Sequence, residues 1–398
     1  MLIVKFLNER QVPKCHCFPV IHLLMTNFYF NDIKLLDIEL SNNCNAACPM
    51  CARNIHGHST NPRLQLNELT FSDIQNIDKS ILNNIEFINV SGNYGDPLMC
   101  KDILKIIGYL QEQTTAKICI HTNGGLRNAT IWKQLGEWDN IEIRFGIDGL
   151  EDTNHKYRIN VRWDLLMNNI KTYINAGGNA TWIFLVFFHN QHQVEEARLL
   201  AKELKFNKFK TIVSDRWRAD NFPVLDKEGK LKYNLFPGSI DIDEYEQFAH
   251  RKSGSLDVTQ KQNKKGYGYL KNGVGKEKWR DFVLHRYQPS LSCYALKDKR
   301  LYIDANGYVF PCNSLGYLRG WANRYDYFAD QVLESLNSYS KEYTNLKFNT
   351  LENILNGDWF KYIVKTWQSN TINEGRFLMC SHTCGKQSAH KMIKEHTL

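Results

Sequence analysis

Three cysteines in the run SNNCNAACPMCAR have the residue type and spacing needed to bind a metal cluster. Cys44, Cys48 and Cys51 are separated by three and then two residues, and they follow a strand-like segment, LLDIEL. Three sulfur ligands are one too few for a closed tetrahedral metal site. A four-iron cluster has four iron corners, so three cysteines leave one iron open for a small molecule. The spacing favours such an open-site cluster, with structural zinc as the alternative.

Four cysteines near the C-terminus form a second candidate metal group. Cys293 and Cys312 lie in a predicted hairpin, in which two strand-like runs surround the turn 305–307. Cys380 and Cys384 follow later in the chain and have three residues between them. Together the four thiolates could ligate an iron–sulfur cluster or a zinc ion.

The segment from 32 to about 214 must position the first group. Strand-like runs at 35–40, 85–91, 116–122, 141–147, 181–188 and 209–214 alternate with amphipathic, helix-like stretches. Several of these runs are almost continuously apolar, as expected for strands that are buried on both faces. Six strand–helix units predict an α/β fold with a parallel sheet and right-handed crossovers. In parallel barrels the chemistry lies where strands end and loops begin.

The cysteine spacing resembles the signature of the radical S-adenosylmethionine (radical SAM) enzymes. The resemblance implies a partial, six-stranded (β/α)6 barrel with a [4Fe-4S] cluster on Cys44, Cys48 and Cys51. It also implies that S-adenosylmethionine chelates the open iron and is cleaved to a 5'-deoxyadenosyl radical, which abstracts a hydrogen atom from the substrate.

Loops after the next three strands resemble cofactor-binding loops of the same family. GNYGDP resembles the family's Gly-Gly-Glu-Pro-like loop, TNG resembles the loop beside the cofactor, and GIDG stands where the family often reads Ser-x-Asp-Gly. Gly146 takes the place of that serine. HKYR resembles an H-x-x-R segment, whose arginine could pair with the cofactor carboxylate. The cofactor contacts implied in this way are Gly95, Asp96, Asn123, Asp148 and Arg158.

Each of these short motifs also has a simpler interpretation. A loop such as GDP or TNG is by itself an ordinary turn, and Arg158 could be a surface arginine. No residue is singled out as the catalytic acid or base. Cys100 and Cys119 are interpreted as small buried side chains.

The C-terminal cysteines resemble the SPASM and twitch extensions of radical SAM enzymes, which carry auxiliary clusters. Cys293, Gly307 and Cys312 match the opening of that pattern. Because only four cysteines are present, the single-cluster, twitch-type extension is the closer match. The resemblance implies an auxiliary [4Fe-4S] cluster on Cys293, Cys312, Cys380 and Cys384.

Composition restricts the class of protein. The longest purely apolar run, 182–188, is seven residues, far short of the ~20 needed to span a bilayer, so no membrane partner is expected. Eleven cysteines without a secretory signal indicate reduced thiols or metal ligands in the cytoplasm. Residues 251–286 hold ten basic and three acidic residues, which indicates a solvated loop or contact with an acidic partner.

These observations predict four parts of the chain: a leader (1–31), a radical SAM partial barrel (32–220), a basic Lys/Gly-containing insert (221–290) and a twitch-like domain (291–398). The leader is either functional or an over-extended start before Met25. The expected partners are a reductant such as flavodoxin or ferredoxin and a peptide or small-molecule substrate. The alternative is a zinc-stabilised nucleic-acid-binding protein, because basic and aromatic residues in the insert could contact phosphates and bases.

Overall fold

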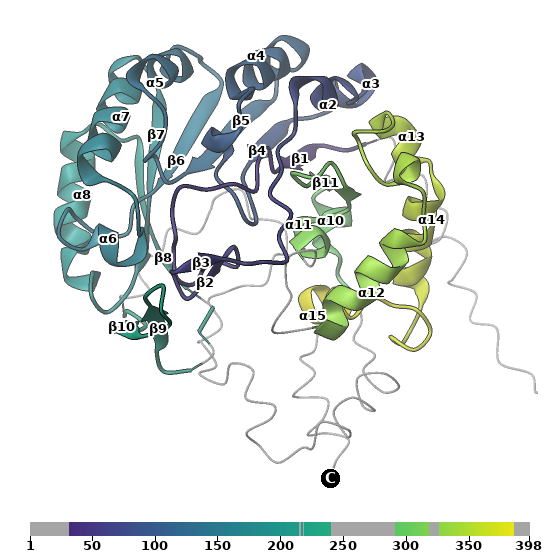
Figure 1. Cartoon of the computed structure of the whole chain (residues 1–398). Coiled ribbons are helices and arrows are strands. Elements are labelled where there is room, and N and C mark those ends of the chain that lie inside the picture. The colour runs from purple at the N-terminus through teal and green to yellow at the C-terminus, as the bar shows by residue number, and fades with distance from the viewer. Residues whose placement is uncertain (1–31, 215, 218, 240–290, 318–325, 386–398) are drawn as a thin grey trace, which may run out of the picture.

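The fold is built on one sheet in which six parallel strands stand in chain order. The computed structural model describes residues 32–214, 216–217, 219–239, 291–317 and 326–385. Every neighbouring pair among the six strands is parallel. They are β1 (Leu35–Ile38), β4 (Phe87–Val90), β5 (Lys117–Thr122), β6 (Ile141–Gly146), β7 (Asn179–Val186) and β8 (Lys208–Val213) (Figure 1). The six predicted strands are confirmed, and so is the mixed α/β fold with a parallel sheet.

Helices follow the strands because the connecting segments carry apolar side chains at helical spacing. In α4 (Ile103–Gln113) the buried side chains recur at the i, i+3, i+4, i+7 spacing of one helix face: Ile103, Ile106, Ile107 and Leu110. Together with α5 (Ala129–Gly136), α7 (Trp163–Asn175) and α8 (Val194–Glu203), this helix covers the outer face of the sheet, as Figure 1 shows.

Aromatic side chains fill the layer between the sheet and helices α5 and α7. The ring of Trp132 stacks on Phe145 at a centroid distance of 5.5 Å, and Tyr173 meets both rings edge-on. All three are fully buried. Burial of such large rings supplies much of the driving force for docking a helix on a sheet.

The predicted C-terminal hairpin is confirmed, and it continues the sheet of the barrel. β11 (Arg300–Ile303) pairs in parallel with β1 and antiparallel with β12 (Val309–Phe310). The turn includes Gly307, whose φ of +89° is readily adopted only by glycine. The sheet therefore has eight strands in the order β12-β11-β1-β4-β5-β6-β7-β8.

Helices of the C-terminal segment pack around a second aromatic core. The indole of Trp359 lies among Phe310, Tyr339 and Phe377. The helices are α10 (Tyr294–Lys297), α11 (Asn313–Gly316), α12 (Asp326–Asn337), α13 (Leu351–Leu355), α14 (Asp358–Gln368) and α15 (Leu378–Cys384). The ring of Phe310 on β12 thus joins this core to the sheet.

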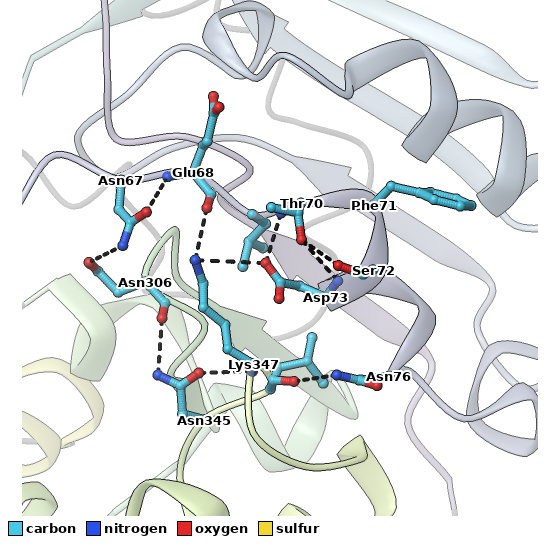
Figure 2. Close-up of polar contacts among 12 residues, drawn as sticks. Asn67, Glu68, Thr70, Phe71, Ser72, Asp73, Asn76, Asn306, Asn345 and Lys347 are labelled. Atoms are coloured by element: carbon cyan, nitrogen blue, oxygen red, sulfur yellow. Dashed lines mark hydrogen bonds and ion pairs between the residues drawn. The ribbon is translucent and has the colours of Figure 1, made fainter.

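Polar contacts fix the C-terminal segment to helix α2 (Phe71–Gln75) of the barrel (Figure 2). Lys347 Nζ donates to the carbonyl of Glu68 at 2.9 Å and lies 3.7 Å from Asp73 Oδ2. Asn76 Nδ2 donates to the carbonyl of Leu346 at 2.8 Å. Most of these groups are partly buried, so water competes with them less than it would at an open surface.

Short elements complete the described part of the chain. Two small antiparallel pairs are β2 (Asn54–Ile55) with β3 (Ser59–Thr60) and β9 (Phe222–Leu225) with β10 (Leu231–Leu235). The short helices are α3 (Lys79–Leu82), α6 (Asn154–Tyr157), η1 (Pro97–Met99), η2 (Gln191–Gln193) and η6 (Lys341–Tyr343). The leader 1–31 and most of the basic insert, residues 240–290, lie outside the described residues. Among the described residues, no helix has the length and apolar character needed to cross a membrane.

Candidate functional site

The three N-terminal cysteines lie in one loop at the carboxyl end of β1. The loop folds back on itself, because Cys51 N donates to the carbonyl of Cys48 at 3.1 Å and Ala46 N points at Cys44 Sγ at 3.4 Å. Asn54 Nδ2 donates to the carbonyl of Cys48 at 3.2 Å and closes the turn. Within this loop the three thiols are near enough for the charges of Cys48 and Cys51 to affect Cys44 and for that of Cys51 to affect Cys48.

The electrostatics of this loop suit a cationic ligand. Burial raises the pKa of Cys44 well above its usual range, and negative charge on Asp96, Cys48 and Cys51 raises it further. Burial likewise raises the pKa of Cys48 to about 11, and the charge of Arg158 opposes that rise. Thiolates crowded together in such a place need nearby positive charge, which iron supplies on binding. The donor set therefore fits an iron–sulfur cluster.

Asp96 and Asn123 lie beside Cys44. Both carboxylate oxygens of Asp96 accept from Thr122 Oγ1 at 2.9 Å, and Asp96 Oδ2 also accepts from the backbone N–H and the side-chain amide of Asn123 at 2.8 Å. The same amide lies 3.7 Å from Cys44 Sγ. The structure therefore brings together two predicted residues from the ends of neighbouring strands β4 and β5.

Gly95 allows the loop after β4 to lie against the cysteine loop. A Cβ atom at this position would lie 1.8 Å from the carbonyl oxygen of Ser41 and 2.6 Å from the Cα of Asn42. Asp96 N donates to the carbonyl of Asn43 at 2.8 Å, which fixes this contact. Any side chain at Gly95 would push the two loops apart.

Asp148 and Arg158 form a buried ion pair beside Cys48. Arg158 Nε lies 2.6 Å from Asp148 Oδ2, and Arg158 Nη1 lies 3.9 Å from Cys48 Sγ. Burial alone would lower the pKa of Arg158, but the charge of Asp148 raises it, so the guanidinium stays positively charged. The arginine side chain is 22% exposed and that of Asp148 is 0% exposed. Arg158 therefore faces the cysteine loop and is not a free surface residue.

Sequence reasoning missed Glu39, a buried carboxyl group at the end of β1. Its Oε1 accepts from the backbone N–H groups of Tyr94 and Gly95 at 2.8 and 3.1 Å, and its Oε2 accepts from Tyr302 at 2.7 Å. Burial raises its pKa to about 7. The signal that could have found it is an acidic residue inside the apolar strand run LLDIEL.

Glu39 also borders a cavity of about 160 Å³ between the barrel and the C-terminal segment. The polar residues that line this cavity come from both parts of the chain: Glu39, Asn42, Arg63, Gln65, Asp304 and Asn306. The cavity lies at the carboxyl ends of β1 and β11, the side of a parallel sheet where ligands bind.

The four C-terminal cysteines line one cavity, with mostly apolar neighbours such as Leu291, Pro311, Trp367 and Met379. A hydrogen bond with Cys384, together with burial and the charges of Cys312 and Cys380, raises the pKa of Cys293 well above its usual range. The hydrogen bond from Cys293 lowers the pKa of Cys384 to about 7. The structure therefore brings all four predicted ligands together, although Cys293 and Cys384 are far apart in the chain.

Among the described residues, no three Cys, His or carboxylate side chains lie close enough together to hold a single metal ion. In a zinc site with four cysteine ligands, every sulfur is about 2.3 Å from the same ion. In an iron–sulfur cluster the thiolates bind different irons, so the sulfur atoms are spread more widely.

Residues 38–201 match the family model of the radical SAM superfamily. The matched segment begins at the last residue of β1 and contains the cysteine loop. It includes four of the six parallel strands in full, β4, β5, β6 and β7, and ends before β8. This part of the chain is a radical SAM domain. Because radical SAM domains are catalytic, the protein is an enzyme.

Solved structures with a similar fold include three proteins that bind S-adenosylmethionine. SuiB of Streptococcus suis bound to S-adenosylmethionine is 16% identical with a TM-score of 0.49, and the likeness covers 90% of this chain and 80% of SuiB. anSMEcpe with bound AdoMet and the Cp18Cys peptide is 14% identical with a TM-score of 0.45, and the likeness covers 91% of this chain and 96% of anSMEcpe. BtrN in complex with AdoMet and 2-DOIA is 11% identical with a TM-score of 0.39, and the likeness covers 90% of this chain and 95% of BtrN. These likenesses are too distant to assign a substrate. Comparison with curated proteins gave no match.

Proposed function

We propose that this enzyme reductively cleaves S-adenosylmethionine at a [4Fe-4S] cluster held by Cys44, Cys48 and Cys51. The observation that carries the proposal is that these three thiols converge in one loop of the radical SAM domain, without a fourth cysteine ligand in that loop. When bound, the cluster and cofactor supply a 5'-deoxyadenosyl radical that abstracts a hydrogen atom from a peptide or small-molecule substrate.

The protein's own residues would position the cofactor on two sides of this loop. On the Cys44 side we assign contact with the cofactor to Gly95, Asp96 and Asn123; on the Cys48 side we assign it to Asp148 and Arg158. The support is their position, since Asn123 and Arg158 each reach a cysteine sulfur and Asp96 and Asp148 hold them there. Asp96, Asn123 and Asp148 are buried, and exclusion of water strengthens their electrostatic contacts.

We further propose that Cys293, Cys312, Cys380 and Cys384 hold an auxiliary [4Fe-4S] cluster in a twitch-like extension. The convergence of the four thiols in one cavity supports this proposal. Trp367 and Tyr294 oppose the rise that burial causes in the pKa of Cys380 and Cys312, respectively. Side chains that favour the thiolate form support cluster ligation and influence the potential of a cluster. Zinc in the same site is the competing outcome.

The test is anaerobic reconstitution with iron and sulfide, followed by metal analysis and turnover. The proposal predicts brown protein with about eight irons per chain, four for each cluster. It also predicts 5'-deoxyadenosine when dithionite and S-adenosylmethionine are added. A content of about four irons and one zinc per chain would support the radical SAM cluster and would show that zinc, and not an iron–sulfur cluster, binds at the auxiliary site. Colourless protein without 5'-deoxyadenosine would contradict both assignments.

A further inference from the structure

Arg158 is held against the cysteine loop by its ion pair with Asp148. Asp148 Oδ1 accepts from Leu185 N at 2.7 Å, and the Asp148 carbonyl accepts from Asn190 Nδ2 at 2.9 Å. The aspartate therefore has little freedom to move with the arginine. If Arg158 left this position, Asp148 would be a fully buried and unpaired charge, which is strongly unfavourable.

Gly146 leaves the space that the guanidinium occupies. A Cβ atom at this position would lie 2.3 Å from Arg158 Nη2 and 2.9 Å from Arg158 Cζ. A contact under 3 Å with the end of a flexible side chain is relieved when that side chain moves, here against its ion pair with Asp148. Any residue larger than glycine at 146 would therefore displace the guanidinium from its position.

Besides Asp148, the guanidinium contacts a cysteine sulfur. Nη1 of Arg158 lies 3.9 Å from Cys48 Sγ, whereas its Nε donates to the Asp148 carboxylate. A bound cysteine thiolate at this position would carry negative charge, and a charged N–H donor beside it stabilises that charge. Hydrogen bonds to sulfur ligands and the net charge around a cluster are two of the factors that set its reduction potential.

We propose that Arg158 is a positioning residue that raises the reduction potential of the Cys44–Cys48–Cys51 cluster through Cys48, and that Asp148 and Gly146 fix its guanidinium there. The proposal rests on the proposed function, since it requires a cluster at these cysteines. Reduction adds negative charge to the cluster, so a positive group at a ligand sulfur stabilises the reduced form more than the oxidised form. This role is separate from any contact between Arg158 and the cofactor carboxylate.

The test is a potentiometric titration of the anaerobically reconstituted full chain, followed by electron paramagnetic resonance and performed without S-adenosylmethionine. The signal of interest is the one that disappears in a Cys48→Ala protein, which separates it from an auxiliary cluster. Because no cofactor is present, a residue that only binds the cofactor carboxylate cannot shift this potential.

Three variants and one control distinguish the charge from its position. Arg158→Gln removes the charge and should shift the potential to a more negative value. Gly146→Ala keeps the charge but displaces it and should shift the potential in the same direction. Arg158→Lys should restore part of the wild-type value, because it keeps a positive charge without the fork of N–H donors. Arg162→Gln removes an exposed arginine that pairs with Asp164 and should leave the potential unchanged.

The outcomes separate this inference from the proposed function. Unchanged potentials in Arg158→Gln and Gly146→Ala proteins that retain wild-type iron content would overturn the role of Arg158 and leave the cluster assignment intact. If the Arg158→Gln protein does not bind iron, the potentials of the Gly146→Ala and Arg158→Lys proteins test the role of Arg158 instead. A wild-type protein without any signal that depends on Cys48 would instead overturn the proposed function, and this inference with it.

Discussion

The backbone N–H of Ser292 donates a hydrogen bond to the carbonyl of Cys384 at 2.8 Å. An isolated antiparallel bridge between Leu291 and Gly385 lies next to it. These contacts bring the start of the C-terminal hairpin to the end of α15, and they place Cys293 beside Cys384. The proposed auxiliary site therefore joins two segments that are distant in the chain.

Removal of residues 380–398 should eliminate the auxiliary site. The truncated protein should lose about four irons per chain, and residues 291–317 should become more sensitive to protease because the segment that they pair with is absent. The first site should keep its iron, since its ligands lie elsewhere. Cys119→Ala is a matched control, because Cys119 is a buried cysteine of the barrel strand β5. An unchanged iron content after truncation would show that these four cysteines do not hold an iron–sulfur cluster.

Gly95→Ala should prevent the close approach of the β4 loop and the cysteine loop. The new Cβ would lie 1.8 Å from the Ser41 carbonyl, so the loops must separate and Asp96 must move away from Cys44. We expect 5'-deoxyadenosine formation to fall by about tenfold or more, since a barrier increase of ~1.4 kcal/mol suffices.

The matched control for this change is Gly108→Ala in helix α4, where the new Cβ meets only Trp138 at 3.9 Å. It should leave the activity unchanged and increase the stability by about 0.5–1 kcal/mol, because glycine is unfavourable within a helix. Full activity in Gly95→Ala would show that the close loop contact is not needed for the reaction.

The buried carboxyl group of Glu39 predicts a pH dependence of stability. Burial raises its pKa from the ordinary 4.5 to about 7, so the folded state binds a proton that the unfolded state has released. The resulting stabilisation is fully present below the ordinary pKa and is lost as the pH rises through about 7. It amounts to at most about 3 kcal/mol.

Thermal unfolding of wild-type and Glu39→Gln protein between about pH 5 and 8 measures this effect. The wild-type Tm should fall relative to the variant as the pH rises, because glutamine does not titrate. The neighbouring titratable groups, Tyr302 and Asp304, are present in both proteins. Parallel pH profiles would show that Glu39 does not titrate in this range.

Asn76→Ala should weaken the attachment of the C-terminal segment to the barrel (Figure 2). The change removes the 2.8 Å bond from Asn76 Nδ2 to the Leu346 carbonyl and leaves that carbonyl without this donor. We expect the free energy of unfolding to fall by about 1–2 kcal/mol. Asn84→Ala is the control, because its 3.1 Å bond to the Ser80 carbonyl is exposed and water can replace it. Equal Tm values for Asn76→Ala and wild-type protein would contradict this role.

The sequence predicted the six parallel strands because each is a short local run rich in apolar residues, and several are almost continuously apolar, such as NATWIFLV in β7. It could not predict that β11 pairs with β1, since Leu36 and Leu301 become neighbours through contacts that neither segment encodes alone. The same limit holds in the site. The motif HKYR indicated Arg158 as a functional residue, but its contact with Cys48 depends on the folded loops. Glu39 stood out in the sequence only as an acidic residue in an apolar strand run, and its contacts with Tyr94, Gly95 and Tyr302 also depend on the fold.

The most direct test of the account is reductive cleavage of S-adenosylmethionine by the reconstituted Cys48→Ala protein under dithionite. With only two of the three cysteine ligands left, the open-site cluster should not form, so 5'-deoxyadenosine should be absent while the wild-type protein produces it. Retention of the auxiliary iron would show that the variant is folded. Continued formation of 5'-deoxyadenosine by Cys48→Ala at the wild-type rate would contradict the assignment of Cys44, Cys48 and Cys51 as the ligands of the catalytic cluster.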